Sequence, residues 1–486
     1  MYLGIDLGTS GIKALLIDDH QRITASASAA LTVSRPHSGW SEQNPAHWVD
    51  ALETVMGVLR STFPARLAAV RGIGLSGQMH GATLLDGEGK VLRPCMLWND
   101  TRSYQEAARL DADPRFREMT GNIVFPGFTA PKLLWVKNNE PEIFAQVAKV
   151  LLPKDYLRFW LTGEYVSDMS DSSGTAWLDV GKRRWSPELL AATDMDESHM
   201  PSLVEGTEVS AVLKPELARR WGIEGTPVVA GGGGDNAASA CGMGVVSPGH
   251  AFVSLGTSGV LFAANGAYLP NPASAVHTFC HALPDTWHQM GVVLSATDAL
   301  NWYASIACST PANLTAELGD ELKAPSGVTF LPYLSGERTP YNDAAIRGAF
   351  VGLGRESDRA TLTQAVVEGV SFAFRDCLEA LAAAGTKLDR VTAVGGGSRS
   401  DYWLKAIATA LGIPVDVPGD GDFGGAFGAA RLGLIAAEKA DPWAVCTLPA
   451  IAETIEPEAH LRGAFDEAYE RYRALYPALR GDRVGN

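Results

Sequence analysis

The sequence predicts an α/β protein made of two similar domains that face each other across a central cleft. The pentapeptide Leu-Gly-Thr-Ser-Gly occurs at residues 7–11 and again at residues 255–259, about half the chain apart. Strand-like sequence flanks each copy on both sides, so each copy predicts a β-hairpin. A chain of 486 residues is also long for a single hydrophobic core, and two domains are the default at this length.

The first hairpin begins the chain, with strands expected within residues 2–17. Alternation along the first strand puts Leu3 and Ile5 on one face and Asp6 on the other, beside the glycine turn. Such turns offer backbone N–H groups and hydroxyls without bulky side chains, which suits phosphate oxygens. Ser254 stands in the second copy where the first has Asp6. Only one half carries a carboxylate at this place, an asymmetry that indicates an enzyme.

The next segments continue the α/β pattern. A third strand is expected near residues 22–26, a helix over residues 44–59 that Asn-Pro opens as N-cap and first residue, and a strand over residues 70–75. Residues 72–77 match the dinucleotide pattern G-x-G-x-x-G letter for letter. Their apolar residues belong to the strand itself and no helix opens within them, so we do not interpret them as a dinucleotide site.

A second internal similarity occurs in the same order as the first. Residues 228–230 lead into four glycines at 231–234 and a helix of small residues at 237–244. The glycine-rich residues 419–425 lead into a comparable helix at 426–432. Helices this poor in bulk can approach closely, as two helices crossing between domains do. The alternative is two unrelated glycine-rich helix starts.

The chain is expected to divide near residues 245–249, into an N-terminal domain of residues 1–245 and a C-terminal domain of residues 246–486. In the second domain a strand at 391–394 precedes three glycines and a helix, an arrangement common in nucleotide sites. From about residue 457 the pattern predicts an amphipathic helix that packs on this domain.

Composition excludes several classes of protein. A formal charge of −15 argues against nucleic acid or an anionic membrane surface as the main partner. Residues 236–284 carry no Asp, Glu, Lys or Arg, but glycines and prolines interrupt them too often for a membrane-spanning helix. We interpret them as buried interior near the cleft. Six scattered cysteines indicate reduced, mostly buried thiols, and the expected compartment is the cytoplasm.

Two carboxylates are candidates for chemistry. Asp235 follows four glycines and precedes a helix, so it could accept a proton from a substrate hydroxyl during phosphoryl transfer. The alternative is that Asp235 only caps this helix. Asp6 could hold Mg²⁺ through water, or it could only cap the turn at Gly8. No Gly-Lys-Ser/Thr sequence exists, and the ten histidines show no metal-ligand spacing.

Several longer motifs, taken in order, closely resemble the FGGY carbohydrate kinases, and within them the bacterial xylulokinases. Residues 127–139 are similar to the first family signature and residues 348–368 to the second, which departs at Thr361. Phe427 is a further departure, since a smaller or aliphatic residue is usual there. The xylulokinase-like motifs are Trp-Ser-Glu-Gln at 40–43, Gly-Gln-Met-His-Gly at 77–81, Trp-Asn-Asp-Thr-Arg at 98–102 and Pro-Tyr-Leu-Ser-Gly-Glu-Arg at 332–338.

The resemblance implies an actin-like, ribonuclease-H-like ATPase fold with a central cleft in which ATP and a sugar meet. It implies Asp235 as the catalytic base and Asp6 as the support of Mg²⁺ and the transferring phosphate. Met79 and His80 match the pair that contacts the ketose. The positions that match the nucleotide side are Thr9, Thr257, Gly396, Gly397 and Asp401.

The activity implied is phosphorylation of D-xylulose by ATP, with the sugar bound by the N-terminal domain and the nucleotide by the C-terminal domain. Three alternatives stay open at this point. The chain could phosphorylate another sugar or polyol, such as ribulose, gluconate or glycerol; it could be an actin-like assembly or chaperone ATPase; or it could be a silent regulator. The expected partners are the sugar and ATP, with neither nucleic acid nor membrane, and a homodimer is possible.

Overall fold

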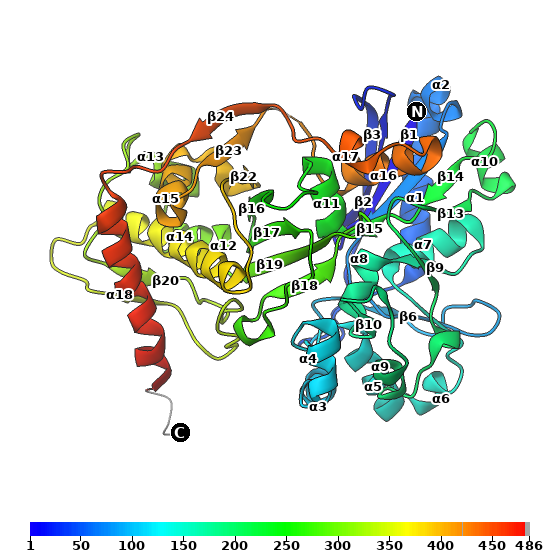
Figure 1. Cartoon of the computed structure of the whole chain (residues 1–486), viewed down its shortest axis with the longest axis horizontal. Helices are drawn as coiled ribbons and strands as arrows, with labels where there is room; N and C mark the ends of the chain where they lie inside the picture. The colour runs from blue at the N-terminus through cyan, green and yellow to red at the C-terminus, as the bar shows by residue number, and fades with distance from the viewer. Residues whose placement is uncertain (420, 482–486) are drawn as a thin grey trace.

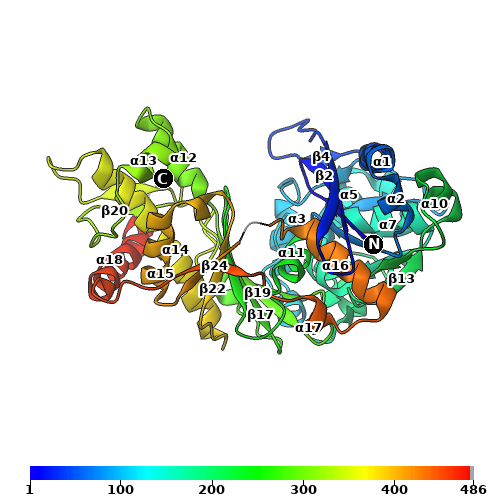
Figure 2. The same ribbon diagram turned by 90° about the horizontal axis from the view of Figure 1, so that it is seen from above.

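The computed structural model describes residues 1–419 and 421–481. Two parts of the chain lie outside the described residues: position 420, in the second glycine-rich turn, and positions 482–486, in the predicted C-terminal domain. Figures 1 and 2 show two lobes, one formed by the N-terminal elements and the other by the elements of the second half. Helices α16 (Gly425–Glu438) and α17 (Pro442–Val445), near the end of the chain, lie on the N-terminal lobe.

A seven-stranded mixed sheet forms the centre of the N-terminal lobe. The first hairpin pairs β1 with β2 antiparallel, β3 continues on the outside of β2, and β5 and β14 add parallel strands on the other side of β1. Its strands in spatial order are β3 (Ile23–Ala30), β2 (Gly11–Ile17), β1 (Tyr2–Leu7), β5 (Gly72–Gly77), β14 (Val228–Ala230) and β13 (Val209–Val212), with β15 (Gly233–Gly234) also pairing β5.

The second sheet repeats this arrangement. The hairpin β16–β17 is antiparallel, β19 lies outside β17, and β22 and β23 are parallel additions beyond β16. Its strands in spatial order are β18 (His277–Cys280), β19 (Trp287–Val293), β17 (Gly259–Asn265), β16 (Ala251–Leu255), β22 (Val391–Val394), β23 (Val415–Pro418) and β24 (Ile451–Ile455). Six strands of each sheet, from β3 to β13 and from β19 to β24, have the same order and direction, which confirms the duplication predicted from the repeated pentapeptide.

Two helices of small residues cross beside the first sheet. These are α11 (Asp235–Met243) and α16 (Gly425–Glu438). A Cβ atom on Gly428 of α16 would lie 1.7 Å from the carbonyl oxygen of Ala238 on α11, so only glycine permits this approach. A Cβ on Gly74 of β5 would lie 1.7 Å from the carbonyl oxygen of Ala429. The predicted close approach of the two helices is therefore confirmed.

The other elements complete the layers around the two sheets. Those before residue 245 are α1 (Pro45–Thr62), α2 (Pro64–Ala68), α3 (Tyr104–Asp111), α4 (Pro114–Thr120), α5 (Thr129–Asn139), α6 (Pro141–Phe144), α7 (Pro153–Thr162), α8 (Met169–Ser172), α9 (Pro187–Ala191), α10 (Pro215–Trp221), β4 (Glu42–Gln43), β6 (Thr83–Leu85), β7 (Cys95–Met96), β8 (Lys149–Leu151), β9 (Val166–Asp168), β10 (Leu178–Asp179), β11 (Arg184–Trp185) and β12 (Ser202–Val204). Those after it are α12 (Thr297–Ile306), α13 (Pro311–Ala316), β20 (Thr329–Leu331), β21 (Ala349–Val351), α14 (Arg359–Ala383), α15 (Asp401–Leu411), α17 (Pro442–Val445) and α18 (Arg462–Gly481).

Most predicted elements exist, with shifted ends. The strand expected at 22–26 runs to Ala30, and the helix expected from residue 457 begins at Arg462. The helix expected from residue 237 begins at Asp235, because an acidic side chain is favourable in a first helical turn. Residues 72–77 form β5 and not a nucleotide turn, as predicted.

The thiols and the uncharged stretch also follow the predictions. The six cysteines are free, and five of them are buried. Within the part of the chain that the structure describes, no helix has the length and apolar character needed to span a membrane.

Candidate active site

Asp235 is the first residue of α11 and directly follows β15. The N-cap of this helix is Gly234, so the interpretation of Asp235 as a helix cap is wrong. One carboxylate oxygen of Asp235 accepts hydrogen bonds from the backbone N of Asn236 at 2.7 Å and from its Nδ2 at 3.0 Å. Burial, followed by the negative charge of Asp6, raises the pKa of Asp235 to about 6. This carboxylate is ionised at neutral pH and can accept a proton.

Asp6 is the penultimate residue of β1, on the face opposite Leu3 and Ile5, which are fully buried. Its Oδ1 accepts a hydrogen bond from Ser76 Oγ at 2.9 Å, so the carboxylate is held against β5. Ser76 is the register partner of Asp6 and also of Gly233 in β15. Strand β5 therefore places Asp6 beside the glycine run that carries Asp235. Burial raises the pKa of Asp6, which the charge of Lys13 opposes.

Lys13 and Asp422 extend this group of charges, and the sequence analysis missed both. Lys13 is the register partner of Asp6 on β2, and its Nζ forms an ion pair with a carboxylate oxygen of Asp422, in the turn before α16. Lys13 is the one charged residue in the apolar strand Gly11–Ile17. A lone cation opposite a candidate carboxylate was the signal that could have identified it.

Met79 and His80 lie on the other side of the glycine run. A Cβ on Gly234 would lie 2.9 Å from Met79 Cγ, so Met79 packs directly against the residue before Asp235. His80 stacks on Phe128 with ring centroids 4.7 Å apart. Its Nδ1 lies 2.7 Å from the carbonyl oxygen of Gly174, an acceptor, so Nδ1 carries the proton. Burial lowers the pKa of His80 to about 3, and the ring is neutral with Nε2 as a free acceptor.

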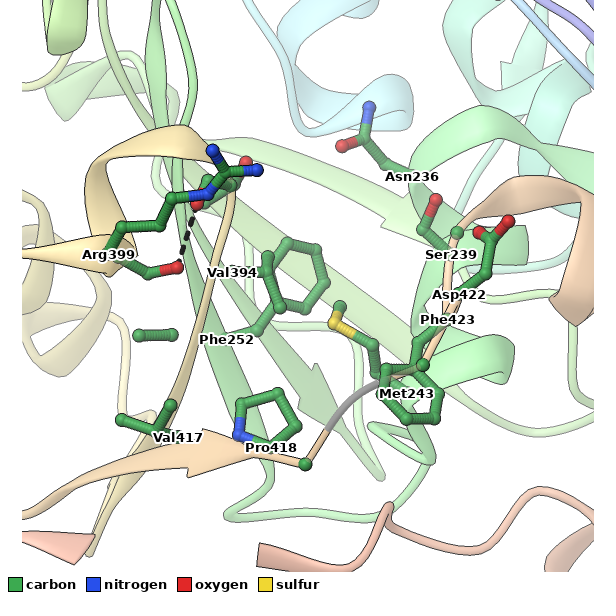
Figure 3. A pocket seen from close by; sticks show the side chains of 17 residues that line it. Asn236, Ser239, Met243, Phe252, Val394, Arg399, Val417, Pro418, Asp422 and Phe423 are labelled. Atoms are coloured by element: carbon green, nitrogen blue, oxygen red, sulfur yellow. Dashed lines mark hydrogen bonds between the residues drawn. The ribbon is translucent and has the colours of Figure 1, made fainter. Parts of the chain in front are cut away.

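A cavity of about 660 Å³ lies beside α11 and is lined in part by residues of this helix (Figure 3). Asn236, Ser239 and Met243 of α11 line this cavity, Arg399 lies across from them, and Ser254 also lines it. Because Ser254 is the counterpart of Asp6, this cavity brings the second hairpin strand to the helix that Asp235 opens.

A second cavity of about 660 Å³ adjoins the first, and Arg399 lines both. Its walls come from α12, α13 and the start of α15, and they include Gly396, Gly397 and Asp401. The strand, glycines and helix occur in the predicted order, and Gly396–Arg399 form a short 3₁₀ turn between β22 and α15. No Cβ on Gly396 would meet another atom within 4 Å, so its backbone is open to a ligand.

Comparisons with known proteins agree with this geometry. The N-terminal domain model of the FGGY family of carbohydrate kinases matches residues 1–242, and the C-terminal domain model matches residues 251–437. The chain belongs to the FGGY family of carbohydrate kinases. It is 49% identical over 485 residues to a protein named xylulose kinase from Escherichia coli K12, covering 99% of both chains.

Two solved structures illustrate the range of this FGGY kinase's relatives. A structure described as a xyloylose kinase, from Brucella ovis, is 68% identical, with a TM-score of 0.98 and 99% of both chains covered. A gluconate kinase from Lactobacillus acidophilus is 26% identical, with a TM-score of 0.91, and the match covers 98% of this chain and 97% of the other. The two-domain α/β structure has the actin-like fold that the resemblance implied.

Thr9 and Thr257 occupy the two hairpin turns of the FGGY kinase. Thr9 Oγ1 donates to Gln78 Oε1 at 3.0 Å and accepts from Trp98 Nε1 at 3.0 Å, which ties the first turn to the segments around Met79. Thr257 has an exposed side chain, and its carbonyl oxygen accepts from the backbone N of Ala296 at 2.9 Å. The second turn is thus fixed to the start of α12, which lines the second cavity.

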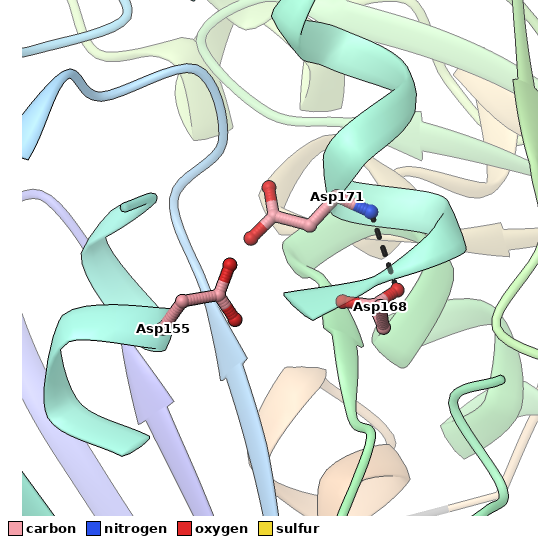
Figure 4. A group of neighbouring side chains, drawn as sticks. All are labelled: Asp155, Asp168 and Asp171. Atoms are coloured by element: carbon pink, nitrogen blue, oxygen red, sulfur yellow. Dashed lines mark hydrogen bonds between the residues drawn. The ribbon is translucent and has the colours of Figure 1, made fainter. Parts of the chain in front are cut away.

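Three buried carboxylates lie close together near the glycine run (Figure 4). Among the described residues, Asp155, Asp168 and Asp171 form a group whose oxygens lie within 4.8 Å of one another. Lys154 Nζ lies 2.5 Å, 2.7 Å and 3.2 Å from their respective oxygens, and all four side chains are fully buried. The cation among these carboxylates is the lysine ammonium, so we assign an ion-pair cluster and not a metal centre.

Proposed function

We propose that this FGGY kinase transfers the γ-phosphoryl group of ATP to the 5-hydroxyl of D-xylulose, with Asp235 as general base. The observation that carries the proposal is the position of Asp235 between two different surfaces. Its predecessor Gly234 packs on Met79, and its successor Asn236 lines the first cavity. The name of the E. coli relative supports xylulose as the substrate.

The hydroxyl oxygen attacks the γ-phosphorus and a new O–P bond forms, while the bond from phosphorus to the bridging oxygen breaks and ADP leaves with that electron pair. The hydroxyl proton passes to the Asp235 carboxylate. With a pKa of about 6, Asp235 is ionised before the step and releases the proton to water afterwards.

The residues near Asp6 fit Mg²⁺. Asp6 and Asp422 interact electrostatically, and Asp6 in turn raises the pKa of Asp235, so several carboxylate oxygens share one region. Such oxygens are the ligands that Mg²⁺ takes in proteins. Asp6 would hold the ion through water. When bound, Mg²⁺ would supply neutralisation of the phosphate charges.

The sugar and the nucleotide are assigned to opposite sides of Asp235. We assign Met79 and His80 to the ketose, with the free Nε2 of His80 accepting from a sugar hydroxyl. We assign the two cavities to ATP, through Thr9 and Thr257 on the phosphates and Gly396, Gly397 and Asp401 at the nucleotide. This division corresponds to a sugar domain of residues 1–245 and a nucleotide domain of residues 246–486. We also propose a cytoplasmic homodimer, which light scattering after gel filtration would test.

The test is ADP release with D-xylulose, D-ribulose, D-gluconate and glycerol, using the parent and the Asp235→Ala variant. We expect the highest kcat/KM for D-xylulose. Removal of the base should lower turnover about 100-fold or more, because general-base contributions are of that order. Thermal unfolding of both proteins controls for the fold.

Other results would change the proposal. A higher kcat/KM for another substrate would replace xylulose while keeping the kinase. Turnover of Asp235→Ala within about threefold of the parent would remove the base assignment. Sugar-independent polymerisation, or hydrolysis stimulated by peptides, would favour an actin-like assembly or chaperone role.

A further inference from the structure

The buried ion-pair cluster lies directly behind the glycine run that carries Asp235. We define the cluster as Lys154, Asp155, Arg158, Asp168, Ser170 and Asp171, from α7, β9 and α8. All six side chains are fully buried. A Cβ on Gly233 would lie 3.2 Å from Ser170 Oγ, so the cluster touches β15 without an intervening side chain.

Two members of the cluster bind the backbone of the glycine run. The backbone N–H of Gly234 donates to Ser170 Oγ at 3.1 Å. Arg158 donates through Nη1 to the carbonyl oxygen of Ala230 at 2.5 Å and through Nη2 to that of Gly231. Hydrogen bonds therefore hold both ends of residues 230–234.

The rest of the cluster fixes these two side chains. Asp168 accepts hydrogen bonds from the backbone N of Ser170 at 2.8 Å and from its hydroxyl, so Ser170 Oγ keeps its lone pairs for Gly234. Lys154 joins Asp168 to Asp155, and Arg158 lies 3.6 Å from Asp155. Burial raises the pKa of Asp171, the third carboxyl group within reach of Lys154.

We propose that Ser170, held by this cluster, is a positioning residue that fixes the direction of the Asp235 carboxylate through the N–H of Gly234. The inference rests on the proposed role of Asp235 as the base. Four glycines permit the close backbone approach but leave the chain free to move, because glycine restricts φ and ψ least. An external clamp is needed to hold the next residue in line with the reacting atoms.

The experiment compares Ser170→Ala with Ser172→Ala. Ser172 lies on the same short helix and is equally buried, but its hydroxyl donates to Ser167 Oγ at 2.9 Å and does not touch the glycine run. We expect Ser170→Ala to lower kcat about tenfold to a hundredfold with the KM values for ATP and D-xylulose near those of the parent, because small misplacements of a reacting group cost this much. We expect Ser172→Ala to keep kcat within about threefold. Both variants are compared by thermal unfolding.

A double-mutant cycle tests whether Ser170 affects kcat through Asp235. Asp235→Glu adds one methylene and displaces the carboxylate from its aligned position, so a further shift of the backbone at Gly234 should matter less to the rate. We expect Ser170→Ala to change kcat less than about threefold in the Asp235→Glu background. An equal loss in both backgrounds, or equal kcat for Ser170→Ala and Ser172→Ala, would overturn the inference. Parental turnover in Asp235→Ala would contradict the proposed role of Asp235 as the base. That outcome is distinguishable from a failure of the Ser170 inference, because it does not involve Ser170.

Discussion

At the scale of single residues, the unusual feature is a carboxyl group whose pKa of about 6 lies near that of an ordinary histidine. His80 does not titrate in this range, because burial lowers its pKa to about 3. Lys132 donates from beneath it to the carbonyl oxygens of His80 at 2.8 Å and of Gly127 at 2.7 Å, which holds the backbone of His80 at φ 68°. The His80 imidazole is thus neutral. Burial lowers the pKa of Lys132 to about 7, and Asp235 is the proposed base.

A pH profile tests this assignment. The base works only when it is deprotonated, so kcat/KM for D-xylulose should fall about tenfold per pH unit as the pH drops below about 6. In the Asp235→Asn variant the residual rate should lose this acid limb, since the amide does not titrate. Steady-state rates between pH 5 and pH 8 supply the measurement. A limb that persists in Asp235→Asn would assign the titration to another group.

At the scale of elements, the sequence predicted the features that depend on local patterns and did not predict those that depend on long-range contacts. The hairpins and β5 were predicted because alternation and glycine turns are local signals. Lys13 and Asp422 are joined across about 400 residues, and Ser170 and Gly234 meet through two separate elements. No spacing in the sequence marks such pairs. The candidate carboxylates, and Lys13 as a lone cation in an apolar strand, could therefore be predicted, whereas the distant partners Asp422 and Ser170 could not.

The motifs that resemble the family also take part in contacts that the sequence did not predict. Residues 40–43 and 98–102 stood out as signatures, and the structure joins them in one buried network. Arg102 Nη2 lies 2.8 Å from a carboxylate oxygen of Glu42 and 2.6 Å from one of Asp100. These residues stabilise the meeting of two segments of the N-terminal lobe. A motif can identify a family through residues whose contribution is structural.

The crossing of α11 and α16 leads to a stability prediction. Gly428→Ala should lower the free energy of unfolding by about 1–3 kcal/mol or more, because its Cβ would meet the backbone of Ala238 at 1.7 Å. Gly57→Ala is the matched control, since this glycine on α1 is exposed and its Cβ would meet no atom within 4 Å. Gly57→Ala should raise the free energy of unfolding by roughly 0.5–1 kcal/mol. Denaturant unfolding of both variants measures the difference, and equal effects would show that the crossing is looser than described.

At the scale of the whole molecule, the two halves are similar in topology but are not independent bodies. Met79, Phe128 and Met243 share one hydrophobic cluster with Phe252 and Phe279 of the second half. Helix α16 comes from the second half of the chain and packs on β1, β5 and β14 of the first sheet. The repeated pentapeptide predicted the duplication, and the small residues of α16 predicted a close crossing between domains, but the sequence did not indicate that this helix covers the first sheet.

The packing of α16 on the first sheet predicts how a fragment of residues 1–245 behaves. Without α16 it exposes the apolar face that Tyr2, Leu15 and Ile17 bury against Ala430 in one cluster. Burial of each large side chain stabilises by roughly 1.5–3 kcal/mol, which is a large fraction of the stability of a domain. We expect the fragment to aggregate or to unfold without cooperativity, and a fragment with residues 424–446 joined by a flexible linker to unfold in one cooperative step. Circular dichroism during thermal unfolding distinguishes the two, and a stable, cooperative fragment without α16 would contradict the prediction.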